Sequence, residues 1–297
     1  MDHVYDRAVE DVGNIVHLEH VNLRIPEQRL ATLFYVSGLG LTRDPYLMTG
    51  IGNMWVNVGR SQFHLPQGEP QLLRGHVAIV LPSRAELLRR LAAVRRDLEG
   101  TRFAFHEHED HVEATCPWGN RICCYEPQDR FGPIVLGMPV VECDVPLGSA
   151  EPITRFYREI IGARATTADH DGLQARVAVG IGQELVFRET DRPIPPYDGH
   201  HIQIYLAGFS GPHRRLLERE LITEESDQHQ YRFREIVDPD SGRRLFTLEH
   251  EVRSMRHPLY ARPLVNRNPD VSNTRYAPGH EALAWSLPPS PDFAAAR

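Results

Sequence analysis

The chain presents the same order of sequence landmarks twice. The string LEHVNLRIPEQRLATLFYVSGLG, which begins at Leu18, is matched 122 residues later by VVECDVPLGSAEPITRFYREIIG. A second pair, RGHVAIVLP and GHHIQIYL, is shifted by 125 residues, and a third, CPWGNRICCYEP and DPDSGRRLFTLEHE, by 123. Three landmarks at a nearly constant shift indicate that one fold is built twice in this chain.

Each copy divides again into two smaller units, each of one strand, one helix and several further strands. Polar and apolar residues alternate over 18–26, which is the period of a half-buried strand. A helix is expected over 27–37, where the glycines of GLG end it. The next helix has Ser83 as its N-cap, Glu86 three residues later and Gly100 at its end. The second half repeats this order, with helices expected near 149–161 and 211–221.

The length of 297 residues fits two domains of roughly 130 residues each. We expect a first domain over 15–127, a second over 138–252, and an irregular tail over 253–297. The tail is rich in proline and poor in periodic apolar residues, so it has no core of its own.

Composition excludes several classes of function. The net charge of −7 gives no sign of a basic surface that would bind nucleic acid. No apolar run approaches the roughly 18 residues that cross a membrane, and the amino terminus lacks the order of a signal peptide. The four cysteines show no disulfide spacing, which favours a cytoplasmic location.

The modules resemble those of the vicinal oxygen chelate superfamily, which includes glyoxalase I, extradiol dioxygenases and fosfomycin-resistance proteins. The resemblance covers about residues 15–252 and is carried by HVNLRIP, FYVSGLGL, GHVAIVLP and PWGNRICCYEP, with ECDVP, HHIQIYL and DPDSGRRLFTLE in the second half. It implies an α+β fold in which four βαβββ modules pair into two open, glyoxalase-like β-barrel domains. It also implies a divalent metal inside the barrel, held by residues from first and last strands.

The resemblance places His20 and His76 at the two first-strand ligand positions, and His64 on the last strand of the first module. Cys123 occupies the slot where the family carries a carboxylate. Glu126 is the alternative, although three residues along a strand it faces the other way unless a bulge intervenes. Such a site suits Fe(II), with Zn, Ni, Mn or Cu as other candidates, and a thiol favours softer ions.

The second half offers a less complete set of ligands. Glu142 and His201 hold its first-strand positions, while the closing slot falls on Phe246, which cannot bind a metal. Glu249 lies where Glu126 lies in the first half. Two interpretations remain open: a second metal site, or a buried Glu142–His201 pair that satisfies both polar groups without an ion.

Tyr125 lies two residues from Cys123, so it shares that face of the strand and is the candidate catalytic phenol. We expect a metal-dependent enzyme for a small oxygen-rich substrate, in which the ion chelates two substrate oxygens. The imidazole-rich ligands and the two-domain size favour an Fe(II) dioxygenase. The alternatives are a glyoxalase-like isomerase or lyase and a binding or resistance protein without turnover. Two ways of closing the barrel remain open, within each half or between two chains, and the second would make the protein a homodimer.

Overall fold

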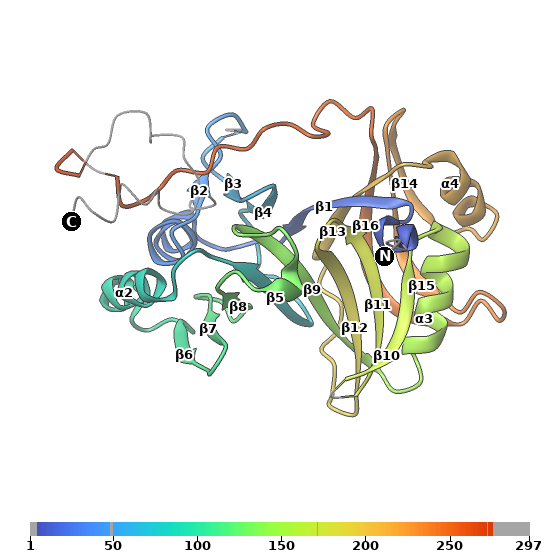
Figure 1. Cartoon of the computed structure of the whole chain (residues 1–297), viewed down its shortest axis with the longest axis horizontal. Helices are drawn as coiled ribbons and strands as arrows, with labels where there is room; N and C mark the ends of the chain where they lie inside the picture. The colour runs from blue at the N-terminus through green and yellow to red at the C-terminus, as the bar shows by residue number, and fades with distance from the viewer. Residues whose placement is uncertain (1–4, 48–49, 171, 272, 276–297) are drawn as a thin grey trace. The chain divides into compact units, whose positions relative to one another are not determined.

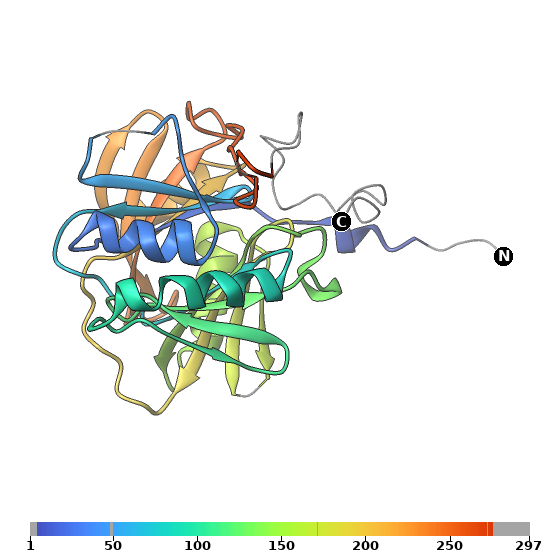
Figure 2. The ribbon, with the colours of Figure 1, turned by 90° about the vertical axis from the view of Figure 1, so that its left-hand side faces the viewer.

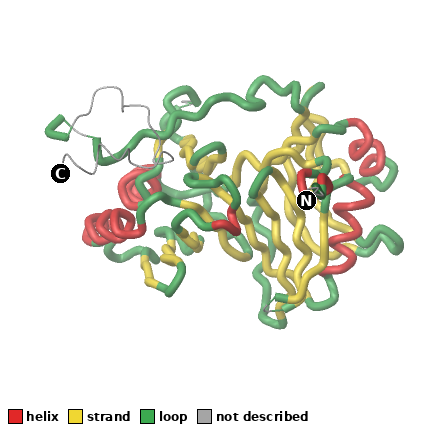
Figure 3. The backbone as a smooth tube through the Cα atoms, viewed as in Figure 1, coloured by secondary structure: helices red, strands yellow, loops and turns green. Residues whose placement is uncertain are grey.

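The computed structural model describes residues 5–47, 50–170, 172–271 and 273–275 and contains two eight-stranded mixed sheets (Figure 1). The strand order is β14-β15-β16-β13-β1-β4-β3-β2 in the first sheet and β10-β11-β12-β9-β5-β8-β7-β6 in the second. Strands outnumber helices throughout, and neither sheet closes into a complete barrel (Figure 3). The predicted α+β class is therefore confirmed.

Four modules of strand, helix and three strands follow one another along the chain. The first two contain β1 (Ile15–Asn22), α1 (Gln28–Ala31) with a π-helical turn (Thr32–Gly38), β2 (Thr42–Arg43), β3 (Asn53–Val58) and β4 (Ser61–Pro66), then β5 (Gly75–Val80), α2 (Arg84–Val94), β6 (Ala104–Glu107), β7 (His111–Thr115) and β8 (Arg121–Tyr125). The other two contain β9 (Gly137–Pro146), α3 (Ala150–Phe156) with a π-helical turn (Tyr157–Ile161), β10 (Ala165–Asp169), β11 (Leu173–Gly180) and β12 (Gln183–Thr190), then β13 (His201–Leu206), α4 (Ser210–Leu217), β14 (Ile222–Asp227), β15 (Gln230–Val237) and β16 (Arg244–Ser254). Short 3₁₀ turns occur at Arg7–Glu10, Arg96–Leu98 and Asp129–Phe131.

Each sheet takes its strands from both halves of the repeat. The first and fourth modules supply one sheet, in which β1 neighbours β13, and the second and third supply the other, in which β5 neighbours β9. First strands of different halves are therefore adjacent.

The chain forms two compact units, which are described separately. Unit 1 comprises Met1–Leu18, Asp144–Ile194 and Gln203–Tyr260, and unit 2 comprises Glu19–Cys143, Pro195–Ile202 and Ala261–Arg297.

In unit 2, β1 pairs in parallel with β4, and β5 pairs in parallel with β8. The helix formed by α1 and the π-helical turn packs beside α2 (Figure 2). Gly38 permits this close approach, because a Cβ there would lie 3.3 Å from the side chain of Val94. The predicted N-cap of α2 is confirmed, since the Ser83 hydroxyl accepts a hydrogen bond from the Glu86 amide at 3.3 Å.

Within the predicted tail of 253–297, Arg253 and Ser254 still belong to β16 and the chain stays in unit 1 to Tyr260, whereas the segment that begins at Ala261 belongs to unit 2. Arg262 donates to the buried Asp44 carboxylate at 2.8 Å, and Asn266 exchanges two hydrogen bonds with the backbone of Gly59, at 2.7 and 2.9 Å. Burial raises the pKa of Asp44, but hydrogen bonds from Arg262 and two backbone amides outweigh it, so the net shift is downward. The segment 262–266 is thus bound to the residues that follow β2 and β3, although its apolar residues show no periodicity.

Unit 1 has an aromatic core between its antiparallel strands and helix α3. The Tyr157 hydroxyl lies 2.6 Å from His250 Nε2, and His250 Nδ1 donates to the Leu248 carbonyl at 2.7 Å; both side chains are fully buried. Burial lowers the pKa of His250 to about 3, so this imidazole is neutral and serves the fold. Within the described residues, no helix is long and apolar enough to cross a membrane.

Candidate metal centre

His20 lies on β1 and is completely buried. Its Nδ1 lies 3.4 Å from an oxygen of Glu19, which is also buried. A carboxylate can only accept, so it favours the tautomer with the proton on Nδ1 and the lone pair on Nε2. Carboxylates beside metal-binding histidines commonly act in this way, orienting the ring and raising its basicity.

His64 lies on β4, directly opposite Asn22 of β1. The Asn22 amide nitrogen donates to His64 Nδ1 at 2.6 Å, and His64 Nε2 donates to the Asn53 amide oxygen at 2.8 Å. An amide nitrogen only donates and an amide oxygen only accepts, so these bonds define a neutral imidazole with its proton on Nε2.

Trp55 of β3 forms a wall beside both histidines. Its indole stacks on the His64 ring, with centroids 3.7 Å apart and planes 11° apart, and meets His20 edge-on at 5.0 Å. The side chain is 8% exposed, so it leaves little room for water at this side of the two rings.

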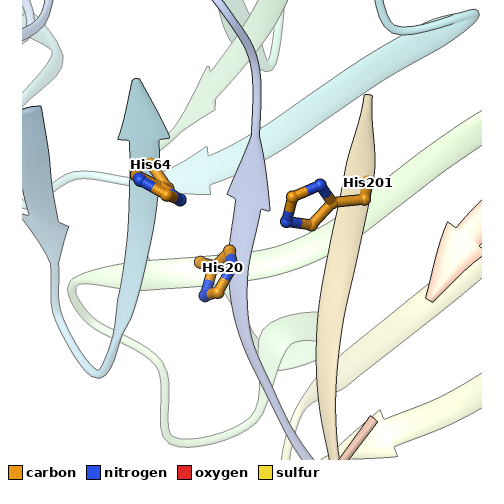
Figure 4. Close-up of side chains that lie close together, drawn as sticks. All are labelled: His20, His64 and His201. Atoms are coloured by element: carbon orange, nitrogen blue, oxygen red, sulfur yellow. The ribbon is translucent and has the colours of Figure 1, made fainter. Parts of the chain in front are cut away.

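His201, the first residue of β13, completes a group of three imidazoles. One ring nitrogen from each of His20, His64 and His201 lies within 4.8 Å of the other two. Figure 4 shows the three rings coming from three separate strands toward one another. Among the described residues this is the one group of three or more histidine, cysteine or acidic side chains arranged closely enough to hold an ion.

The donor set fits a divalent metal. Imidazole nitrogens bound to one ion lie ~2.1 Å from it, and therefore roughly 3 to 3.5 Å from one another. Side-chain rotations that move each nitrogen by about 1 Å would bring the observed group to that geometry. Three imidazoles suit Zn, Cu, Fe and Ni better than Ca or Mg, which prefer oxygen.

The structure places His76 apart from this group, because β5 belongs to the other sheet. There His76 lies directly opposite Glu142 of β9, with its Nδ1 3.7 Å from the carboxylate. The Glu142–His201 pair considered from the sequence is thus replaced by a Glu142–His76 pair. Adjacent first strands bring His201 to His20 and Glu142 to His76.

Cys123 also lies in the second sheet, on β8 opposite Ala78 of β5. Burial, and then the negative charge of Glu113, raise the pKa of the Cys123 thiol to about 12. The thiol of the metal-free protein is therefore protonated at neutral pH, and Cys123 does not belong to the group of described residues that could hold an ion.

The remaining candidates have other partners. The Tyr125 ring is tilted against Phe131, with centroids 5.2 Å apart, and lies under the Arg130 guanidinium; burial raises the pKa of its phenol to about 12. Glu126 is exposed and accepts from the Arg84 amide at the start of α2, and Glu249 in unit 1 accepts from Arg232 at 2.7 Å. None of these three joins the histidine group formed by described residues.

Sequence reasoning missed Asn22, Asn53 and Glu19 as parts of the site. The sequence could have identified Asn22, because it lies two residues after His20 on a strand and therefore shares its face. Asn53 and Glu19 carry no such signal, because their roles depend on the side-chain conformations that the folded strands impose.

Comparisons with known proteins support the fold. The structure is similar to glyoxalase I from Zea mays, with a TM-score of 0.56 and 14% identity, over 80% of this chain and 92% of that one. It is also similar to a candidate dioxygenase from Bacillus subtilis, with a TM-score of 0.51 and 15% identity, over 81% and 86%. No protein-family model and no curated protein sequence matches. The chain therefore has a glyoxalase-like fold, as predicted.

Proposed function

We propose that this protein is a metal-dependent enzyme that acts on a small, oxygen-rich substrate. His20, His64 and His201 would hold the ion. The observation that carries the proposal is the convergence of these three imidazoles, from β1, β4 and β13, within 4.8 Å of one another in a largely buried position.

We further propose an Fe(II)-dependent oxygenase. Three neutral ligands on one side of an ion leave other positions open and leave its double positive charge uncompensated, which favours an anionic substrate with two neighbouring oxygens. A bound ion would supply Lewis-acid polarisation of those oxygens and, as iron, electron transfer with dioxygen.

The chain's own residues prepare the site in two ways. Glu19 accepts from His20 Nδ1, so that the basic nitrogen of this ring is Nε2. Trp55 presents an apolar surface beside His20 and His64, which excludes water and suits contact with a planar substrate ring.

A glyoxalase-like isomerase is the alternative within the same fold. Its proton transfer requires a basic group at the ion, and the group of three described residues contains no carboxylate. This composition favours oxidation over isomerisation.

The proposal is tested with untagged protein loaded with iron without oxygen. Catechol, added as a probe, should produce a visible catecholate-to-iron band after oxidation to Fe(III), and Fe(II) protein should consume oxygen. His20→Ala should abolish both signals, whereas His76→Ala, the corresponding change on the first strand of the other sheet, should retain them. Turnover of the methylglyoxal–glutathione hemithioacetal without oxygen uptake would favour the isomerase, and tight catechol binding without turnover would favour a binding protein.

A further inference from the structure

The two asparagines that contact His64 act on opposite sides of its ring. Asn22 donates to Nδ1 at 2.6 Å, and Asn53 accepts from Nε2 at 2.8 Å. Asn22 is 4% exposed and lies on β1, the strand that also carries His20. The nitrogen with the lone pair, Nδ1, is therefore the one directed to the His20 strand.

A histidine that binds a metal through Nδ1 must present that lone pair to the ion and keep its proton on Nε2. It also commonly donates the Nε2 proton to an oxygen, which holds the ring in place. The bond to Asn53 already meets this second requirement. The bond from Asn22 has the opposite effect, because its N–H occupies the lone pair that the ion would take.

We propose that Asn22 is a positioning residue that gates the metal centre by competing with the ion for His64 Nδ1. The inference rests on the proposed metal site. In the metal-free protein the Asn22 amide holds His64 in its binding tautomer. A bound ion would take the place of this amide at His64 Nδ1, while the bond to Asn53 would still hold the ring.

The second sheet provides an internal reference for this arrangement. Asn22 lies opposite His64, and at the corresponding pair of positions Ala78 lies opposite Cys123. Alanine has no side-chain donor, so this competing contact belongs to the histidine group.

The test measures Co(II) affinity of the full chain by competition with a chelator, together with quenching of tryptophan fluorescence by the bound ion. Asn22→Ala should bind Co(II) about tenfold more tightly, because the ion no longer displaces a hydrogen bond. Asn53→Ala should bind about tenfold more weakly, because the ring loses its orienting partner. Asn22→Leu, which is similar in volume, repeats the test should the alanine variant fold poorly.

A purely structural role predicts that both asparagine variants weaken binding, because both loosen the same ring. Unchanged or weaker binding by Asn22→Ala and Asn22→Leu overturns the gate. If the Asn22 variants give this contradicting result while the wild type binds Co(II) and His201→Ala does not, only the role of Asn22 is wrong and the metal centre stands. If the wild type does not bind, or His201→Ala binds equally, the proposed metal centre falls with it.

Discussion

Two corresponding regions of unit 2 carry different chemistry on the same scaffold. On β4, His64 has Asn22 opposite on one neighbouring strand and Trp55 opposite on the other. On β8, Cys123 has Ala78 and Glu113 in the same two places. The first arrangement provides a neutral lone pair beside an aromatic wall. The second provides a protonated thiol beside a carboxylate.

The first strands of the two modules, β1 and β5, differ in the same way as β4 and β8. His20 of β1 meets a second imidazole, His201, whereas His76 of β5 meets the carboxylate Glu142 at 3.7 Å. The two sheets therefore share the register of these strands but carry different side chains at the equivalent positions. The fold thus supplies two places for a site, and side-chain identity decides which one can hold an ion.

The largest expected difference between the two regions is in stability. Trp55→Ala should lower the free energy of unfolding by about 3 to 5 kcal/mol, because it removes a buried indole and leaves a cavity. The matched change Glu113→Ala, at a partly exposed carboxylate, should cost about 0.5 kcal/mol. Urea unfolding followed by circular dichroism measures both. Similar losses in the two variants would mean that the aromatic wall is not specially packed.

His250 of unit 1 provides a third environment, that of an imidazole devoted to the fold. Burial lowers the pKa of His250 to about 3 in the folded protein, below the ordinary value of 6.5, so the unfolded chain binds the proton more readily. Stability should therefore be fully present above about pH 6.5 and fall by roughly 1.4 kcal/mol for each pH unit below it, until about pH 3.

The check on this prediction is the pH dependence of unfolding between pH 4.5 and 7, in the wild type and in His250→Gln. The glutamine variant should be less stable at pH 7 and should show a shallower decline. An equally steep decline in both proteins would assign the acid sensitivity to other groups.

The smallest expected effect is at Cys123. Because Cys123 lies on β8 of the other sheet, apart from the histidine group, Cys123→Ser should leave the Co(II) affinity and the preferred metal unchanged. His64→Ser, at the corresponding position of the first sheet, should lose Co(II) binding. A thiolate-to-cobalt absorption band in the wild type that disappears in Cys123→Ser would show that the thiol is a ligand after all.

The fold could be predicted from the sequence because its signals are local and repeated. Ser83 and Glu86 mark a helix start through bonds between near neighbours. Alternation indicates the strand β1, but Leu18–Asn22 are buried on both faces and the strand is not half-buried as predicted, because burial depends on what packs against each face. The repeated motifs then indicate how many modules follow one another.

The composition of the histidine group could be predicted only in part. His20 and His64 follow from their positions within one module. The choice between His76 and His201 as the third member depends on which first strand lies next to β1, and residues 181 positions apart in the chain carry no local sign of that pairing. The protonation of Cys123 likewise depends on burial and on Glu113, which become neighbours only when β7 pairs with β8.

The most direct test is the metal content per chain of untagged protein, measured by elemental analysis in the wild type, His201→Ala and Glu142→Ala. These variants change the corresponding residue on the first strand of each second-half module. We predict one equivalent of metal in the wild type and in Glu142→Ala, and almost none in His201→Ala. Full metal content in His201→Ala, or its loss in Glu142→Ala alone, would contradict an ion shared by His20, His64 and His201.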